Sequence, residues 1–214
     1  MTILQSRRDE GNSMNEVDSA PCDPRAVEVA ARAVRRLTTA ILDARVRGAA
    51  NPDISKKISA LADRLQDVAA EPRECVTGET GSQDGVLARS PVSGSKNPVA
   101  VPLHFEQCED GSSLAHAEFP RQYQGPPGIV HGGVSGLVLD VAMAVANRAA
   151  GRAGVTAEMT LRYLRPTPLY TEVTVRGRHV RAEGRKVWSQ GTLEVNGEPT
   201  VVCDGLFIAK EPGL

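Results

Sequence analysis

Apolar residues recur at intervals of three and four in two stretches near the start of the chain. The first stretch follows Asp23-Pro24, a capping residue and a first-turn proline, and predicts a helix from 24 to about 47. The second follows Asn51-Pro52 and predicts a helix from 52 to about 70. Each helix is apolar along one stripe only, so it must pack against the other helix, the main domain or a second subunit. Residues 1–22 lack such a pattern, and we expect them to be disordered.

The pattern changes after residues 71–98, which are rich in Gly, Ser, Thr and Pro and are typical of a linker. Beyond them, two strand-like runs flank Asp110-Gly111, which indicates a hairpin, and four further runs follow a helix at about 131–149. The expected strands are Val99–Cys108, Ser112–Phe119, Val155–Leu164, Tyr170–Val180, Lys186–Val195 and Thr200–Lys210. This order predicts an α+β domain at 99–211, in which an antiparallel sheet wraps one central helix.

The expected central helix is apolar or small on every side except at Asp140. This residue is the only formal charge between Arg121 and Arg148. A helix without a polar face is a buried helix. A buried carboxylate costs several kcal/mol, roughly, unless something partners it. Asp140 therefore has a structural partner or is there for chemistry.

Composition narrows the class of protein. The 214 residues suit one domain with appendages, or two small domains, and the formal net charge of −1 argues against nucleic acid or an anionic membrane surface as a partner. The apolar run around Asp140 is too short and too interrupted by glycine for stable membrane insertion. The four cysteines are widely spaced, without a CxxC pair, and Met1–Ala20 has no apolar core for a secretory signal. These features favour reduced thiols, no metal and a cytoplasmic location.

Several spaced motifs in the second half of the chain carry a resemblance to a known family. The motifs are Gly125-Pro126-Pro127-Gly128, His131-Gly132-Gly133, Asp140, Thr156, the segment from Tyr163 to Leu169, and Glu183-Gly184-Arg185-Lys186. Together they resemble the hotdog-fold acyl-CoA thioesterases, in the PaaI-like and thioesterase-superfamily-member branch of the 4-hydroxybenzoyl-CoA thioesterase superfamily. The resemblance covers about residues 90–210. It implies a hotdog fold and hydrolysis of acyl-CoA to free acid and CoA, with no cofactor besides the CoA of the substrate.

Thioester cleavage requires a group that activates water or attacks the carbonyl, and donors for the developing oxyanion. Asp140 supplies the carboxylate, as general base or nucleophile, and Gly132 and Gly133 at the helix start supply free backbone N–H groups. Gly132 and Asp140 are about 12 Å apart along one helix at 1.5 Å per residue, so one carbonyl cannot reach both. The spacing therefore predicts a homodimer with composite sites, with a tetramer left open. The resemblance implies the same arrangement.

Other residues receive roles from the resemblance. We expect His131 to shape the loop and the oxyanion site, and Thr156 to hold the attacking water. Arg185 and Lys186 match a pair that contacts the ligand. Arg162 and Thr174 lie near further contacts, although Arg162 departs from an asparagine in the family.

Basic residues cluster after position 161 and suit the phosphates of CoA, since the arginine fork matches phosphate geometry. They are Arg162, Arg165, Arg176, Arg178, Arg181, Arg185 and Lys186. The low aromatic content, 3%, favours an aliphatic acyl chain.

Two alternatives stay open. One is a non-catalytic acyl-CoA-binding protein that uses the N-terminal helices as an interaction surface. The other is a hotdog hydratase or dehydratase. The dehydratases of this fold carry a histidine directly before a Phe-Pro pair, whereas Glu118 precedes Phe119-Pro120 here.

Overall fold

The computed structural model describes residues 24–43, 52–67, 90–101 and 103–209. The expected disorder of residues 1–22 and most of the expected linker lie outside these residues. The elements in chain order are α1 (Pro24–Asp43), α2 (Pro52–Asp67), β1 (Glu106–Gln107), β2 (Ser113–Glu118), the short 3-10 helix η1 (Arg121–Tyr123), α5 (Gly132–Ala149), β3 (Gly154–Tyr163), β4 (Glu172–Glu183), β5 (Lys186–Val195) and β6 (Glu198–Ala209). Both N-terminal helices begin at the expected prolines. Their expected ends, near 47 and 70, fall outside the described residues.

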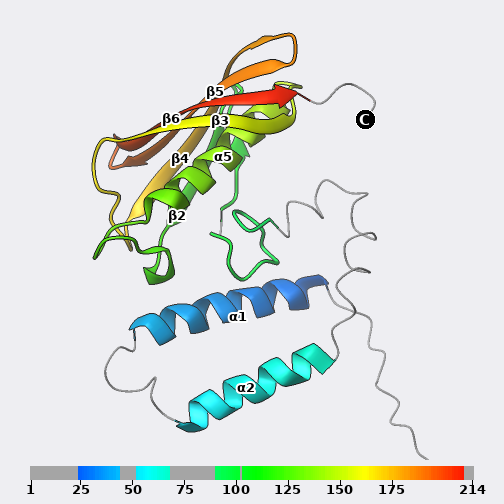
Figure 1. The fold of residues 1–214 in the computed structure, drawn as a ribbon, viewed down its shortest axis with the longest axis vertical. Coiled ribbons are helices and arrows are strands. Elements are labelled where there is room, and N and C mark those ends of the chain that lie inside the picture. The colour runs from blue at the N-terminus through cyan, green and yellow to red at the C-terminus, as the bar shows by residue number, and fades with distance from the viewer. Residues whose placement is uncertain (1–23, 44–51, 68–89, 102, 210–214) are drawn as a thin grey trace, which may run out of the picture.

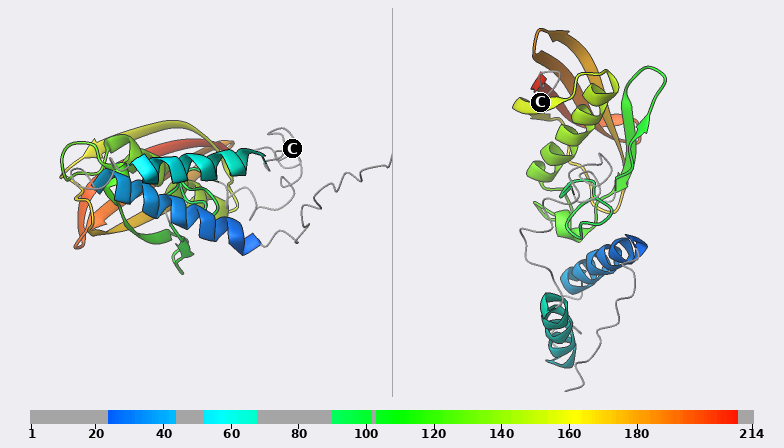
Figure 2. Two further views of the ribbon diagram at one scale, coloured as in Figure 1. Left: turned by 90° about the horizontal axis from the view of Figure 1, so that it is seen from below. Right: turned by 90° about the vertical axis from the view of Figure 1, so that its right-hand side faces the viewer.

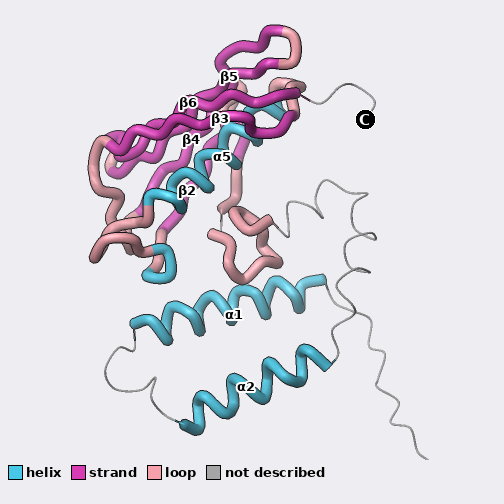
Figure 3. The backbone as a smooth tube through the Cα atoms, in the orientation of Figure 1, coloured by secondary structure: helices cyan, strands magenta, loops and turns pink. Residues whose placement is uncertain are grey.

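The six strands form one sheet in the order β1-β2-β4-β5-β6-β3, and every neighbouring pair is antiparallel. The sheet curves around α5, as Figures 1 and 3 show. This is the hotdog fold expected from the sequence, and the last four strands agree with their expected ranges to within three residues. The turn between β5 and β6 is built by Asn196 and Gly197, both with positive φ (52° and 79°), as a tight hairpin requires.

Glycines in the sheet allow α5 to lie close to it. Gly177 on β4 pairs directly with Gly191 on β5, and a Cβ atom built on Gly177 would lie 2.2 Å from the carbonyl oxygen of Ala142. That carbonyl also accepts a hydrogen bond of 2.8 Å from the Ser113 hydroxyl. The backbone of α5 therefore packs directly against the backbone of β4 at this point, where most sheets have side chains between helix and strand. The side chain of Met143, fully buried, lies beside Gly191 on β5 and Gly205 on β6.

The first hairpin differs from its expectation. β1 comprises only Glu106–Gln107, although the pattern predicts a strand from 99 to 108. Pro98 and Pro102 in this stretch have no N–H for a ladder. Instead Val101 and Leu103 enter the core from irregular backbone. Val92 is also part of the core cluster, so residues of the expected linker pack with the domain.

Helix α1 lies against η1 and the segment from 90 to 101, whereas α2 lies farther from the sheet (Figure 2). The Arg35 guanidinium donates to the carbonyl oxygen of Asn97 at 2.7 Å. None of the described residues of α2 is buried, so its apolar stripe stays largely exposed in the part of the chain that the structure describes. No helix in the described ranges is long and apolar enough to cross a membrane.

Candidate functional site

Helix α5 is covered by the sheet on one side and left open on the other. Val138, Leu139 and Ala142 are fully buried, whereas Leu137 is 42% exposed and Asp140 is half-buried. The expectation of a helix buried on every side is therefore wrong for a single chain. The sheet encloses only one side because β3, at its edge, has no further strand beyond it. The uncovered side carries Asp140.

The structure brings Asp140 and Thr156 together. The Thr156 hydroxyl on β3 donates a hydrogen bond of 2.5 Å to Oδ1 of Asp140. A hydrogen bond from a hydroxyl to a carboxylate is shorter and stronger than one between neutral groups, so it holds the Asp140 side chain in one orientation. The other carboxylate oxygen, Oδ2, has no hydrogen-bond partner among the described residues. Asp140 thus has one fixed and one available oxygen.

The start of α5 is shaped by His131 and Tyr163. Nδ1 of His131 accepts the N–H of Gly133 at 3.0 Å, in the manner of an N-cap. The Tyr163 hydroxyl donates to the Gly132 carbonyl oxygen at 3.0 Å, and its ring occupies the space where a Cβ of Gly132 would lie. Gly133 therefore does not offer a free N–H, contrary to expectation. Within the described parts of the chain, no acceptor takes the N–H of Gly132.

Within one chain, the glycine end of α5 and Asp140 contact opposite ends of β3. Gly132 lies against Tyr163, and Asp140 is bonded to Thr156. Tyr163 lies seven positions after Thr156 along β3, or about 23 Å at about 3.3 Å per residue. A single thioester carbonyl cannot contact both groups of the same chain.

The four residues expected to contact CoA do not lie together in the structure. Lys186 pairs with Ile208, one position from Phe207, which pairs with Thr156, so Arg185 and Lys186 lie at the Asp140 end of the sheet. Arg162 forms an ion pair of 3.1 Å with Asp204 on the face away from α5.

Thr174 lies between two fully buried valines that face the helix, and it therefore points outward. Several other basic residues are engaged locally. Arg165 pairs with Glu198, Arg178 bonds Gln190, and Arg181 stacks on Trp188. The basic residues after 161 therefore do not form one patch.

Cys203 on β6 is buried beneath α5. Burial raises the pKa of its thiol to about 11, with smaller contributions from the carboxylates of Asp204 and Asp140. Cys108 is only partly buried. Among the described residues, no group of three or more His, Cys, Asp or Glu side chains is arranged to hold a metal ion.

We expect iodoacetamide at pH 8 to label Cys108 and to leave Cys203 unmodified, because only the thiolate reacts. The pKa of Cys203 is higher in the folded protein than in the unfolded chain. Its protonated thiol therefore contributes fully to the stability of the fold below pH 9, and this contribution is lost as the pH rises toward 11. Peptide mass spectrometry measures the labelling, and urea denaturation at pH 8 and 10.5 measures the stability. Cys203→Ala should show a weaker loss at high pH, and equal labelling of the two thiols would contradict the prediction.

Comparison with known proteins supports the fold and identifies the family. The family model of the thioesterase superfamily matches residues 127–194. The crystal structure of protein RHA08564, described as a thioesterase superfamily protein, is 35% identical with a TM-score of 0.76, and the match covers 85% of this chain and 94% of that one. An uncharacterized protein of Schizosaccharomyces pombe, C26H8.11c, is 29% identical over 152 residues, which cover 61% of this chain and 85% of that protein.

Mammalian relatives match over a shorter region. The acyl-coenzyme A thioesterase THEM4 of Bos taurus is 32% identical over 91 residues, which are 42% of this chain and 37% of that protein. The THEM4 of Mus musculus is 34% identical over 91 residues, 42% of this chain and 39% of that protein. The chain thus spans less than two fifths of these curated relatives. Because RHA08564 is 35% identical to this chain and is matched over 94% of its length, this chain belongs to the thioesterase superfamily.

Proposed function

We propose that this protein is an acyl-CoA thioesterase that hydrolyses acyl-CoA to a free acid and CoA. The observation that carries the proposal is Asp140, held by Thr156 on the uncovered side of α5, with Oδ2 available. A carboxylate in this position can activate water or attack a thioester carbonyl. The THEM4 relatives, named acyl-coenzyme A thioesterases, support this reaction for the matched region.

Two routes use the same residues. In the first, Oδ2 of Asp140 takes a proton from water while the water oxygen adds to the thioester carbon. In the second, Oδ2 adds directly to that carbon and forms an anhydride, which water then hydrolyses. In both routes the Gly132 N–H, at the positive end of the α5 dipole, stabilises the oxyanion. In the first route the carbon–sulfur bond then breaks, and the CoA thiolate takes up the proton held by Asp140. In the second route the same bond breaks as the anhydride forms, and the CoA thiolate takes up a proton from water.

A homodimer would complete the site. Exposed apolar residues gather on the open side of α5 and on or next to the edge strand β3. They are Leu137 (42% exposed), Val155 (58%), Tyr163 (57%) and Leu164 (51%). An edge strand also presents unpaired N–H and C=O groups, which a second copy can pair. Such a dimer would place Asp140 of one protomer near Gly132 of its partner, with assembly into tetramers as a further possibility.

Leu137→Glu is expected to convert the dimer to monomers and to lower hydrolysis at least tenfold. The reason is that it places a charge on the surface proposed to be buried between protomers, where an unpaired charge is expensive. Multi-angle light scattering over a range of protein concentrations measures the assembly. The matched control is Val180→Glu, at a 44% exposed position on β4, which should leave both properties unchanged. A wild-type monomer with full activity would contradict the dimeric site.

The proposal is tested by measuring CoA release from acyl-CoA esters of increasing chain length. We expect turnover with aliphatic substrates. Tight acyl-CoA binding without turnover at any length would overturn the proposal in favour of a non-catalytic binding protein. Hydration of enoyl-CoA, followed by absorbance, would indicate the hydratase alternative. The cysteine spacing supports a reducing compartment, and we propose the cytoplasm as the location.

A further inference from the structure

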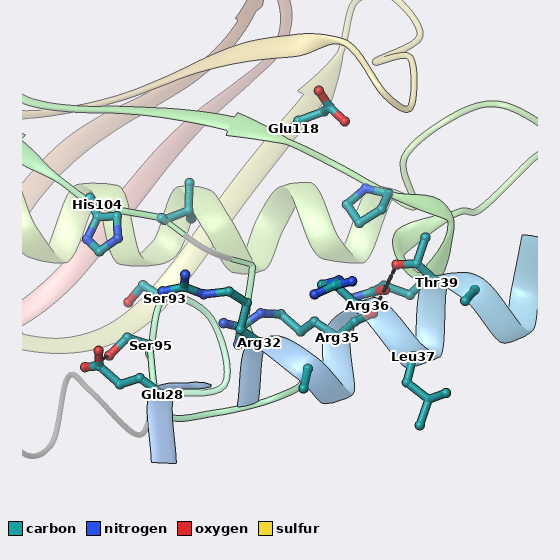
Figure 4. Close-up of a pocket in the computed structure, with 15 residues that line it drawn as sticks. Glu28, Arg32, Arg35, Arg36, Leu37, Thr39, Ser93, Ser95, His104 and Glu118 are labelled. Carbon is teal, nitrogen blue, oxygen red and sulfur yellow. Dashed lines mark hydrogen bonds between the residues drawn. The ribbon is translucent and has the colours of Figure 1, made fainter. Parts of the chain in front are cut away.

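A cleft of about 1130 Å³ lies between α1 and the hotdog domain (Figure 4). Two hydrogen bonds, one at each end of the cleft, join α1 to the domain. The Ser95 hydroxyl donates to Glu28 at 2.8 Å near the start of the helix, and the Thr39 hydroxyl donates to Gln122 at 2.7 Å near its end. The space between these contacts stays open. Its volume is slightly larger than the range of about 300–1,000 Å³ typical of small-molecule sites.

Three arginines of α1 line this cleft: Arg32, Arg35 and Arg36. Figure 4 shows their side chains extending from α1 into the space between the helix and the domain. Arg35 is fixed by its bond to the Asn97 carbonyl oxygen at 2.7 Å. Arg32 and Arg36 lie one helical turn apart and form no hydrogen bond or ion pair with any described residue. Like charges at this spacing destabilise a helix, and an anion between them would remove that cost.

Neither of the acidic residues that line the cleft, Glu28 and Glu118, forms an ion pair with these arginines. Glu28 accepts the Ser95 hydroxyl, and Glu118 lies across the cleft, on the domain side, in Figure 4. The lining also includes Ser93, whose hydroxyl can donate to an anion, and His104. The guanidinium fork matches phosphate oxygens in a bidentate way. Clustered arginines, a hydroxyl donor and this volume suit several phosphate charges on a ligand larger than a simple carboxylic acid.

We propose that the cleft between α1 and the domain binds a phosphorylated small molecule of nucleotide size. Two sources share this chemistry: the phosphates of CoA itself, and a separate nucleotide. The ligand would lie beside η1, where the Tyr123 carbonyl oxygen accepts the His131 N–H at 2.8 Å. Binding at this cleft is independent of the hydrolysis proposed for Asp140.

The test is isothermal titration of the full chain with inorganic pyrophosphate and, separately, with free CoA. The variant Arg32→Gln/Arg36→Gln removes two positive charges from the cleft side of α1. The matched control, Lys57→Gln/Arg64→Gln, removes two exposed charges from α2. We expect the Kd for at least one probe to rise tenfold or more in the cleft variant and less than twofold in the control. Circular dichroism melting checks that both variants fold.

The two probes separate the sources of phosphate. If CoA binding weakens in the cleft variant, the ligand is CoA. If only pyrophosphate binding weakens, the ligand is a separate phosphorylated molecule. The proposal is overturned if wild type binds neither probe, or if neither probe is weakened more in the cleft variant than in the control. Neither probe carries a thioester, so these results do not depend on whether the protein hydrolyses acyl-CoA.

Discussion

Asp140→Asn should lower kcat for acyl-CoA hydrolysis by roughly 10²- to 10⁴-fold, the usual contribution of a positioned general base. The amide neither accepts a proton from water at neutral pH nor attacks a carbonyl. Its carbonyl oxygen can still accept the Thr156 hydroxyl, so the local structure should persist. Release of CoA, followed with a thiol reagent, measures the effect. KM should change little because the variant removes no contact to CoA.

The control for this variant is Asp204→Asn on the outer face of the sheet. Asp204 pairs with Arg162 and accepts a bond from Gln190, so the change removes one carboxylate on the strand next to β3 without touching α5. Its kcat should stay within about twofold, since a partly exposed ion pair contributes little. If Asp140→Asn retained most of the wild-type activity, both proposed routes would be wrong.

Most of the fold is readable from local pattern. The tight turn at Asn196-Gly197 and the alternation on either side set β5 and β6, and the helix start at His131 follows a glycine- and proline-rich loop. The extent of the first hairpin cannot be predicted from local pattern in the same way. The run from 99 to 108 alternates like a strand, but the core takes up Val101 and Leu103 without a ladder. Local alternation reports which residues are buried and not whether a neighbouring strand is available to pair.

The candidate site was predictable in part. The resemblance singled out Asp140 and Thr156, and the structure places them in contact. The hydrogen bond from Tyr163 to Gly132 cannot be predicted from local pattern, because it joins residues 31 positions apart and depends on where β3 passes the helix start. Thr174 is a residue that the resemblance placed near a ligand contact but that the structure places on the outer face of the sheet. A one-residue step along a strand reverses the face to which a side chain points, so a position near a family contact can face away from the site.

The close contact between the glycines of the sheet and the backbone of α5 cannot be recognised from the sequence. A substitution at this contact has the largest expected effect on stability. Gly177→Ala should lower the free energy of unfolding by about 3 kcal/mol or more, the upper range for an overpacked core. The added Cβ would lie 2.2 Å from the Ala142 carbonyl oxygen and 2.7 Å from the Ser113 hydroxyl. The first is backbone, so relief requires α5 to move off the sheet, and the second threatens the hydrogen bond that Ser113 donates to Ala142.

Gly191→Ala is the matched control, because Gly191 is the direct cross-strand partner of Gly177. A Cβ at this position would meet Leu139 Cδ2 at 3.1 Å, the end of a side chain that can rotate. Urea denaturation followed by circular dichroism should show a loss less than half that of Gly177→Ala. Equal losses would mean that glycine is needed for the strands themselves. A larger loss at Gly177 would place the constraint at the contact between sheet and helix backbone, which sets how deeply α5 sits and therefore where Asp140 meets Thr156.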